Sequence, residues 1–214
     1  MPTVLYYVPY SAPCRAVLLT AKILNIELEL KHVDLQRMEH MAPEFIKINI
    51  QHKVPVLVEE DGFTLSESRA IIIYLAEKYD KSCNLYPKDP KIRAMVNHRL
   101  FFDIGTLYQR CLNYYVPIWK KGKAAADPYK KAKVDEAFEY LNTYLEGQKY
   151  VTGDQLTLAD ISIVASVASL TDCKFLIIFL INTDKSPVLN ITLNQKRGVE
   201  KGPLMTDSQF FDHF

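Results

Sequence analysis

The sequence lacks an excess of charge of either sign. Its 214 residues include 26 Lys and Arg and 25 Asp and Glu, which gives a formal net charge of +1. Proteins that bind nucleic acid through its phosphates usually carry a basic excess, so we expect no nucleic-acid partner. Hydrophobic residues make up 49% of the chain and charged residues 24%, close to the average for globular proteins, which excludes a disordered chain.

Cysteines and long apolar runs are also scarce. The four cysteines form no C-x-x-C pair, so nothing supports a zinc ribbon or a dithiol redox motif, and we expect no metal site. The N-terminus has no basic segment and reaches Pro9 too early for a signal peptide. The densest apolar run, at 175–181, is far shorter than the about 20 residues of a helical membrane span. We therefore expect a cytoplasmic protein without a membrane partner.

The first 80 residues alternate between strand and helix patterns. The predicted elements are a buried strand at 4–8, a helix from 11 to about 25, a half-buried strand at 28–32, a short helix at 43–47, strands at 55–59 and 63–65, and a helix that starts near 66. Asp61-Gly62 predicts a tight hairpin between the last two strands. The order βαβαββα, with a parallel first crossover, predicts a thioredoxin-like α/β domain over residues 1–80.

The pattern becomes purely helical after a linker predicted at 81–90. Helices are expected over 93–115, after the Asp127-Pro128 N-cap, and after a capping box from Thr157 to Asp160. Residues 161–170 are apolar on nearly every face, so we expect a central, buried helix there. The sequence thus predicts an all-α domain over residues 91–214.

The first candidate site residue is Ser11, between the first strand and the first helix. Free backbone N–H groups and the positive end of the helix dipole meet at such a position and favour an anion. A hydroxyl there can donate to a thiolate and lower the pKa of that thiol. A plain N-cap role is the alternative.

Two further segments carry candidate binding groups. In the first, His52 and Lys53 offer positive charge to a carboxylate, and Val54 offers a backbone edge to an extended peptide, with a candidate cis bond to Pro55. The second is the helix start at 66–69, where a carboxylate and an ammonium group can be held. A solvated loop and ordinary helix capping are the alternatives. Together with Ser11, these segments describe a pocket for a short anionic peptide that carries a thiol.

Several longer motifs occur in a fixed order along residues 3–170. They are Tyr7-Val8-Pro9-Tyr10-Ser11-Ala12-Pro13-Cys14-Arg15, Gln51-His52-Lys53-Val54-Pro55, Glu67-Ser68-Arg69-Ala70-Ile71, Arg99-Leu100-Phe101-Phe102-Asp103, Leu107-Tyr108-Gln109-Arg110, Asn142-Thr143-Tyr144-Leu145-Glu146-Gly147 and Leu156-Thr157-Leu158-Ala159-Asp160. This set resembles the insect delta-class glutathione transferases, and the epsilon class is the nearest alternative. The resemblance implies a cytosolic homodimer that conjugates glutathione to small hydrophobic electrophiles in xenobiotic detoxification, with dehydrohalogenase or peroxidase side activity. Glutathione would be a co-substrate and not a permanently bound cofactor.

The resemblance also implies a role for each matching residue. Ser11 would stabilise the glutathione thiolate. The glutathione contacts would be His40 and His52 at the glycyl end with Lys53 nearby, Val54 on the cysteinyl backbone beside a cis Pro55, and Glu67 and Ser68 on the γ-glutamyl head, supported by Arg69. Asp103 would be the acidic member of a charge network that reaches the site of a partner subunit.

The pocket for the second substrate would be apolar and built from both domains. Its candidate residues are Pro13, Tyr108, Cys111, Tyr115, Ile118, Trp119 and Phe211. An aromatic stripe at this spacing fits an ordinary helix core equally well.

The chain departs from the family at three places. Tyr10 stands where a Gly is common, Ile50 stands where a Pro is usual, and residues 171–214 form an atypical tail. Tyr10 and the tail favour one alternative, a non-catalytic protein that binds glutathione or apolar ligands. A second alternative is a thiol transferase that uses Cys14, although a side chain one turn into the helix ordinarily packs against the sheet.

Overall fold

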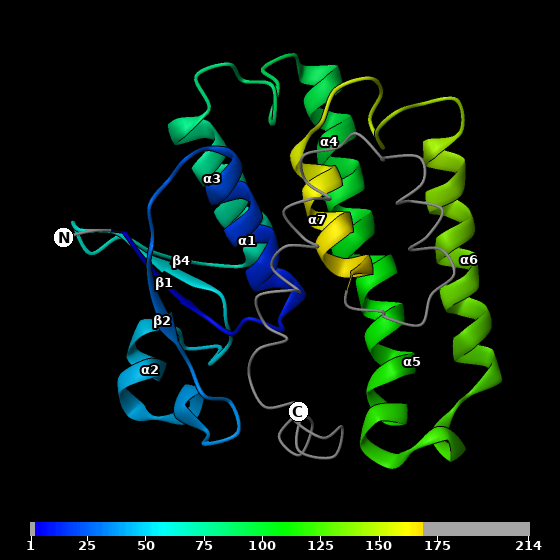
Figure 1. Cartoon of the computed structure of the whole chain (residues 1–214), viewed down its shortest axis with the longest axis horizontal. Helices are drawn as coiled ribbons and strands as arrows, with labels where there is room; N and C mark the ends of the chain where they lie inside the picture. The colour runs from blue at the N-terminus through cyan, green and yellow to red at the C-terminus, as the bar shows by residue number, and fades with distance from the viewer. Residues whose placement is uncertain (1–2, 169–214) are drawn as a thin grey trace.

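The N-terminal half of the chain folds into a four-stranded sheet with flanking helices (Figure 1). A computed structural model of the protein describes residues 3–168. The elements are β1 (Val4–Tyr7), α1 (Ala12–Ile23), β2 (Glu29–His32), the short 3₁₀ helix η1 (Glu39–Met41), α2 (Pro43–Ile48), β3 (Val56–Val58), β4 (Thr64–Ser66) and α3 (Ser68–Tyr79). This order confirms the predicted βαβαββα thioredoxin-like arrangement.

The sheet has the strand order β2-β1-β3-β4. β1 runs parallel to β2, as the predicted crossover requires, and antiparallel to β3, which pairs antiparallel with β4. Helices α1 and α3 lie between the sheet and the helical domain, whereas α2 lies on the other side (Figure 1). The core between the sheet and helices α1 and α3 contains Leu5 and Leu57, fully buried side chains of the two central strands.

β2 differs from its prediction as a half-buried strand. All four of its residues are exposed, and Leu30 keeps 47% of its surface accessible. The apolar alternation in the sequence is real, but β2 is the edge strand of the sheet, so it has a strand neighbour on one side only. Only Leu28, just before the strand, packs against the main core.

The second half of the chain is helical within the described residues (Figure 1). Its elements are α4 (Pro90–Phe102), a π-helical segment η2 (Asp103–Leu107), α5 (Tyr108–Lys121), the 3₁₀ turn η3 (Lys123–Ala125), α6 (Pro128–Leu145) and α7 (Leu158–Val167). Every residue of α7 is buried, and the helix contacts α1, α3 and α4. This confirms the predicted central helix, which joins the two halves of the molecule.

The helix predicted over 93–115 is longer than expected and changes to a π-helical segment in its middle. Helical structure continues without a break from Pro90 to Lys121, and it includes Pro117 within α5. It begins at an N-cap in which the Asp89 carboxylate accepts from two backbone N–H groups. The π-helical segment in its middle was not predicted, because its five residues continue the apolar periodicity of an α-helix.

Both predicted helix starts in the rest of this domain are confirmed. The Asp127 carboxylate accepts from the backbone N–H groups of Tyr129 and Lys130 at the start of α6. At the start of α7, Asp160 Oδ2 accepts from the backbone N–H of Thr157 at 2.9 Å, as in a capping box.

Three further observations concern the described residues as a whole. Cys14, Cys83 and Cys111 are free thiols. Among residues 3–168, no group of three or more His, Cys, Asp or Glu side chains is arranged to hold a metal ion. No helix in that same part of the chain has both the length and the hydropathy that crossing a bilayer demands. Phe211 and the tail at 171–214 lie outside the described residues.

Candidate functional site

The register of the sheet brings the three candidate segments to one end of it. Tyr6 on β1 pairs with Val56 on β3, and Val56 pairs with Ser66 on β4. Because β1 and β4 end where the antiparallel β3 begins, the residues after Tyr7, before Val56 and after Ser66 emerge together. These residues are the Ser11 loop, the His52–Pro55 segment and the start of α3, so the expected convergence is confirmed.

Ser11 is the N-cap of α1, with extended backbone angles of φ −72° and ψ 122°. Its hydroxyl oxygen accepts from the backbone N–H of Cys14 at 3.4 Å, a long hydrogen bond. The plain capping role considered from the sequence is therefore present. It does not compete with a donor role, because a hydroxyl that accepts through one lone pair still carries its own proton.

Cys14 is fully buried, three residues beyond Ser11. Burial raises the pKa of its thiol to about 11, and the hydrogen bond with Ser11 offsets only part of this effect. A thiol of this kind is almost entirely protonated near neutral pH and is inaccessible, whereas a reactive cysteine needs an exposed site of low pKa. The structure therefore argues against the thiol-transferase alternative.

The segment before β3 is shaped by Asn49, which was not among the predicted site residues. The buried Asn49 side chain donates to the Lys53 carbonyl at 2.9 Å and accepts from the Gln51 backbone N–H at 3.1 Å. The loop between these bonds exposes His52 and Lys53, and the Val54–Pro55 peptide bond that follows is cis, as expected. An Asn six residues before a strand-opening Pro was the available signal.

His40 lies beside this loop although it is twelve residues earlier in the chain. Its ring centroid is 6.4 Å from that of His52, with the two planes tilted by 45°. His40 is largely buried, whereas His52 is exposed. The two histidines expected at the same end of the ligand are thus brought together.

The start of α3 has an unusual backbone. Glu67 has a φ of +70°, in the left-handed region, and it is exposed. A non-glycine residue with such an angle is uncommon, and sparsely populated backbone conformations cluster at ligand-binding sites. Ser68 and Arg69, which follow it, are both buried.

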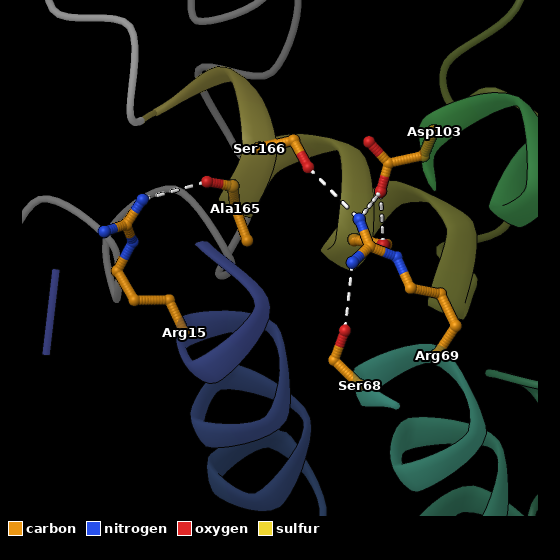
Figure 2. Close-up of polar contacts among 7 residues, drawn as sticks. Arg15, Ser68, Arg69, Asp103, Ala165 and Ser166 are labelled. Atoms are coloured by element: carbon orange, nitrogen blue, oxygen red, sulfur yellow. Dashed lines mark hydrogen bonds and ion pairs between the residues drawn. The ribbon is translucent and has the colours of Figure 1, made fainter. Parts of the chain in front are cut away.

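Arg69 is the centre of a buried polar network between the domains (Figure 2). Its Nη2 lies 2.5 Å from Asp103 Oδ2 and 3.3 Å from Ser166 Oγ, and its Nη1 donates to Ser68 Oγ at 2.9 Å. Asp103 Oδ2 also accepts from the Ser162 hydroxyl at 2.5 Å. The sequence signal for this network is the pair of serines, Ser162 and Ser166, at i and i+4 in the otherwise apolar helix α7.

Asp103 lies in the interior of its own chain, and its expected link to a partner subunit stays a prediction. The resemblance assigned this carboxylate to a charge network that reaches a partner subunit's site, with a role in glutathione binding. Asp103 is completely buried, and its carboxylate is bonded to Arg69 and Ser162 of its own chain. The printed contacts of Asp103 therefore lie within its own chain, and Arg69 connects them to Ser68.

The residues proposed for the second substrate fall into two groups. Tyr108, Tyr115, Ile118 and Trp119 line α5 and are partly exposed, and the rings of Tyr115 and Trp119 stack with centroids 5.8 Å apart. Pro13, on α1, is also partly exposed. Cys111 keeps only 3% of its surface accessible and belongs to the main core, so its assignment to the pocket is corrected.

Tyr108 links this group to the α/β domain. The guanidinium of Arg69 lies 5.7 Å from the centre of the Tyr108 ring, within the range of a cation–π contact. Burial raises the pKa of the Tyr108 hydroxyl to about 12, and the positive charges of Arg69 and Arg15 offset part of that rise. The hydroxyl is therefore a neutral donor at physiological pH.

Arg15 connects the Ser11 loop to α7. Its Nη1 donates to the Tyr10 carbonyl at 2.7 Å, and its Nη2 donates to the Ala165 carbonyl at 3.0 Å (Figure 2). Ala165 and Ser166, adjacent residues in the last turn of α7, thus each receive a hydrogen bond from an arginine of the α/β domain. In the sequence Arg15 stands out only as part of a longer motif, and its two carbonyl partners carry no local signal.

Two family models match the sequence. The model of the glutathione S-transferase N-terminal domain matches residues 5–83, and the model of the glutathione S-transferase C-terminal domain matches residues 91–187. The second match extends past residue 170, where the sequence motifs were expected to end. Part of the segment regarded as atypical therefore still resembles the family.

Solved structures of insect proteins are similar to the chain over most of its length. The Bombyx mori glutathione transferase BmGSTD1 is 41% identical, with a TM-score of 0.84, over 91% of this chain and 92% of that one. A Nilaparvata lugens delta-class glutathione transferase is 47% identical, with a TM-score of 0.75, over 94% and 90%. An epsilon-class glutathione S-transferase from the housefly, Musca domestica, is 36% identical, with a TM-score of 0.80, over 92% and 95%.

Proposed function

The chain belongs to the glutathione S-transferase family, and from this premise we propose that its Ser11 hydroxyl holds the sulfur of glutathione as a thiolate for attack on hydrophobic electrophiles. An ordinary cysteine thiol has a pKa near 8.5, so only a few per cent is ionised at neutral pH. Each unit by which the site lowers that pKa corresponds to about 1.4 kcal/mol of preference for the anion.

The observation that carries this proposal is the position of Ser11 at the N-cap of α1. Its oxygen is fixed by the Cys14 backbone N–H, which leaves the hydroxyl proton as the group to point at a ligand. The N-terminal end of α1 adds the positive end of a helix dipole at the same place. Both contributions favour the charged sulfur over the neutral thiol, whose proton passes to solvent, while Ser11 and the helix end keep their own protons throughout.

The neighbouring segments supply contacts for the rest of the tripeptide. We assign the glycyl carboxylate to His40, His52 and Lys53, the cysteinyl backbone to Val54 beside the cis Pro55, and the γ-glutamyl group to Glu67 and Ser68. Arg69 supports this last contact, because its Nη1 donates to Ser68 Oγ. Glutathione enters this scheme as a co-substrate that leaves as part of the conjugate, and not as a resident cofactor.

The electrophile would bind beside α5, next to Tyr108, Tyr115, Ile118 and Trp119. These side chains are apolar or aromatic and partly exposed, as an acceptor site for a hydrophobic compound requires. The delta class is the assignment we favour, since the Nilaparvata lugens delta-class protein is 47% identical to this chain and the housefly epsilon-class protein is 36% identical. Xenobiotic compounds are the proposed substrates, and dehydrohalogenation and peroxide reduction need only the same thiolate.

We also propose that the protein works as a cytoplasmic homodimer. α4 exposes three large apolar side chains, Ile92, Met95 and Phe101, and Phe101 keeps 72% of its surface accessible. Large apolar side chains that stay exposed on one element are typical of surfaces that another subunit covers. Sedimentation equilibrium tests this point, and a monomer at micromolar concentration would contradict it.

A pH titration of the bound thiol tests the catalytic proposal directly. The absorbance of the glutathione thiolate is followed in complex with the wild-type protein and with the variants Ser11→Ala and Ser11→Thr. We expect the thiol pKa to rise by about one to two units in Ser11→Ala and to change little in Ser11→Thr, which retains a hydroxyl. An unchanged pKa in Ser11→Ala would show that another group stabilises the thiolate.

A further inference from the structure

Arg15 joins two backbone carbonyls that lie far apart in the sequence. It sits in the first turn of α1, four residues after Ser11, and donates to the carbonyl of Tyr10 and to the carbonyl of Ala165 through different nitrogens. Figure 2 shows its side chain extending from α1 to the last turn of α7, apart from the network around Arg69. Tyr10 is the residue directly before Ser11, so this contact bears on the candidate catalytic hydroxyl.

The peptide group between Tyr10 and Ser11 is held on both sides. Its carbonyl accepts from Arg15 Nη1 at 2.7 Å, and its N–H donates to the Val8 carbonyl at 3.3 Å. A peptide group is planar, so holding both ends fixes the orientation of the whole plane. The Ser11 side chain branches from the next atom along the chain, and its direction therefore depends on that plane.

The chemistry of the guanidinium suits this task. Its planar fork presents several N–H donors in fixed directions, so one group can bond two carbonyls at once, whereas a lysine ammonium is a single point charge on a flexible stem. The last turn of α7, which contains Ala165, is the negative end of that helix and favours a cation. Burial lowers the pKa of the Arg15 guanidinium, which shows that its charge is placed there at a cost in solvation.

We propose that Arg15 is a positioning residue for the thiolate-stabilising hydroxyl, because it fixes the Tyr10–Ser11 peptide group against the last turn of α7 and thereby sets the direction in which Ser11 donates. This inference rests on the proposed role of Ser11. It also means that the helical domain, through Ala165, contributes to the geometry of a group in the α/β domain. Hydrogen bonds weaken steeply when donor and acceptor are misaligned, so a small rotation of this peptide plane is enough to weaken the contact with sulfur.

The charge of Arg15 offers a different explanation, and one substitution separates the two. Arg15→Lys retains the positive charge but lacks the fork, whereas Arg15→Gln lacks the charge. If Arg15 acts by position, both variants raise the pKa of the bound thiol by about 0.5 to 1 unit, which corresponds to a three- to tenfold weaker preference for the thiolate. If charge alone acted, the thiol pKa in Arg15→Lys would match that in the wild type. Only Arg15→Gln would then raise the thiol pKa, and this result would overturn the proposal.

The experiment uses the full-length protein, glutathione and a chloronitrobenzene, with the thiolate absorbance titration as the main readout. Arg99→Lys is the matched control, because Arg99 is also buried and also donates to a distant carbonyl, that of Val151, at 3.0 Å. We expect this control to lose stability without a change in the thiol pKa. A merely structural role for Arg15 would give the same result as the control, and would refute the positioning role.

Two further variants keep the outcomes distinct. If Ser11→Ala raises the thiol pKa and neither Arg15 variant does, the inference fails while the proposed function stands. If Ser11→Ala has no effect, the proposed function itself fails.

Should the Arg15 variants not fold, Tyr10→Gly provides the test. In that variant Arg15 still donates to the backbone carbonyl of residue 10, so we expect the pKa of the bound thiol to change by less than about 0.3 units. A shift as large as that of Ser11→Ala would overturn the proposal.

Discussion

Arg69 on α3 and Asp103 at the start of the π-helical segment form a buried ion pair between the two domains, with 2.5 Å between Nη2 and Oδ2. The same arginine donates to Ser68 Oγ, and the same carboxylate oxygen accepts from Ser162. Ser68 follows Glu67, the residue with the left-handed backbone. The pair therefore ties the segment proposed to hold the γ-glutamyl group to the central helix α7.

The first prediction concerns this ion pair. Asp103→Asn leaves the Arg69 guanidinium buried without a counter-charge, and removing one partner of such a pair typically costs about 3–5 kcal/mol. We expect a loss in the free energy of unfolding of about 3 kcal/mol, since Asn keeps one acceptor oxygen. We also expect a severalfold rise in KM for glutathione with a smaller change in kcat. The reason is that Arg69, which donates to Ser68, is no longer held in place by the Asp103 carboxylate.

Urea unfolding and steady-state kinetics check this result, with Asp135→Asn as the control. Asp135 pairs with Lys131 on the exposed face of α6, where an ion pair contributes about 0.5 kcal/mol or less. Equal losses of stability in the two variants would contradict the importance assigned to the buried pair.

The second prediction separates the two roles of Ser11. Replacing an N-cap serine by Ala costs about 1 kcal/mol of stability, whereas Gly costs only a few tenths. Neither residue has a hydroxyl to donate. Ser11→Ala and Ser11→Gly should therefore lose turnover of a chloronitrobenzene to a similar extent, about 10- to 100-fold for a rise of one to two units in the thiol pKa, although their stabilities differ. If Ser11→Gly kept turnover close to that of the wild type and only the less stable Ser11→Ala lost it, the donor role would be refuted.

The third prediction concerns the loop that presents His52 and Lys53. Asn49→Ala removes both hydrogen bonds of the Asn49 side chain and leaves the Lys53 carbonyl without that donor. We expect a loss of about 1–3 kcal/mol in stability and a higher KM for glutathione with kcat nearly unchanged, since the loop is proposed to bind the ligand and takes no part in the chemistry. Asn142→Ala, at an exposed position of α6, is the control. An equal fall in kcat would place the loop in the chemical step.

Local sequence signals predicted most of the α/β domain. The strands at β1, β3 and β4 and the tight turn at Asp61-Gly62 follow from short-range alternation and turn chemistry, which depend on neighbours in the chain. The N-cap at Asp127 and the capping box at Thr157 and Asp160 were predictable for the same reason. Positions of Ser11, Val54 and Ser68 followed from these elements, because the order of strands and helices places them at one end of the sheet.

The long-range contacts that complete the site could not be predicted from local sequence signals. Arg15 reaches a carbonyl 150 residues away, and Arg69 reaches Asp103 and Ser166, which are 34 and 97 residues away. A period of 2 or 3.6 residues carries no information about such partners. The π-helical segment and the exposure of β2 were missed because both depend on how whole elements pack, and not on the local pattern.

The fourth prediction tests whether Cys14 reacts. Cys14 is fully buried and Cys83 is partly exposed, so a thiol reagent at neutral pH should label Cys83 in the native protein and leave Cys14 unmodified until urea is added. Cys14→Ala should retain glutathione conjugation. Disulfide exchange that depends on Cys14 would revive the thiol-transferase alternative. Peptide mass spectrometry after labelling identifies the modified residue.

The last prediction uses the pH dependence of stability that the same thiol imposes. Burial raises the pKa of Cys14 to about 11, so between about pH 9 and pH 11 the folded protein keeps a proton that the unfolded chain has released. Below pH 9 both states bind this proton, and the contribution of Cys14 to stability is constant. As the pH rises from 9 to 11 the unfolded state is favoured by about 1.4 kcal/mol per unit, a total of nearly 3 kcal/mol.

Comparison with Cys14→Ala isolates this effect. The variant has no thiol at this position, so the difference between the two unfolding free energies should be flat below pH 9 and should fall steadily up to pH 11. Tyr108, with a pKa raised to about 12 mainly by burial, adds its own loss of stability above pH 10. The charge of Cys14 is only a minor cause of that rise, so most of the Tyr108 contribution cancels in the difference. A difference that stays flat to pH 11 would mean that Cys14 ionises as easily in the folded protein as in the unfolded chain, and its burial beneath Ser11 would then be wrong.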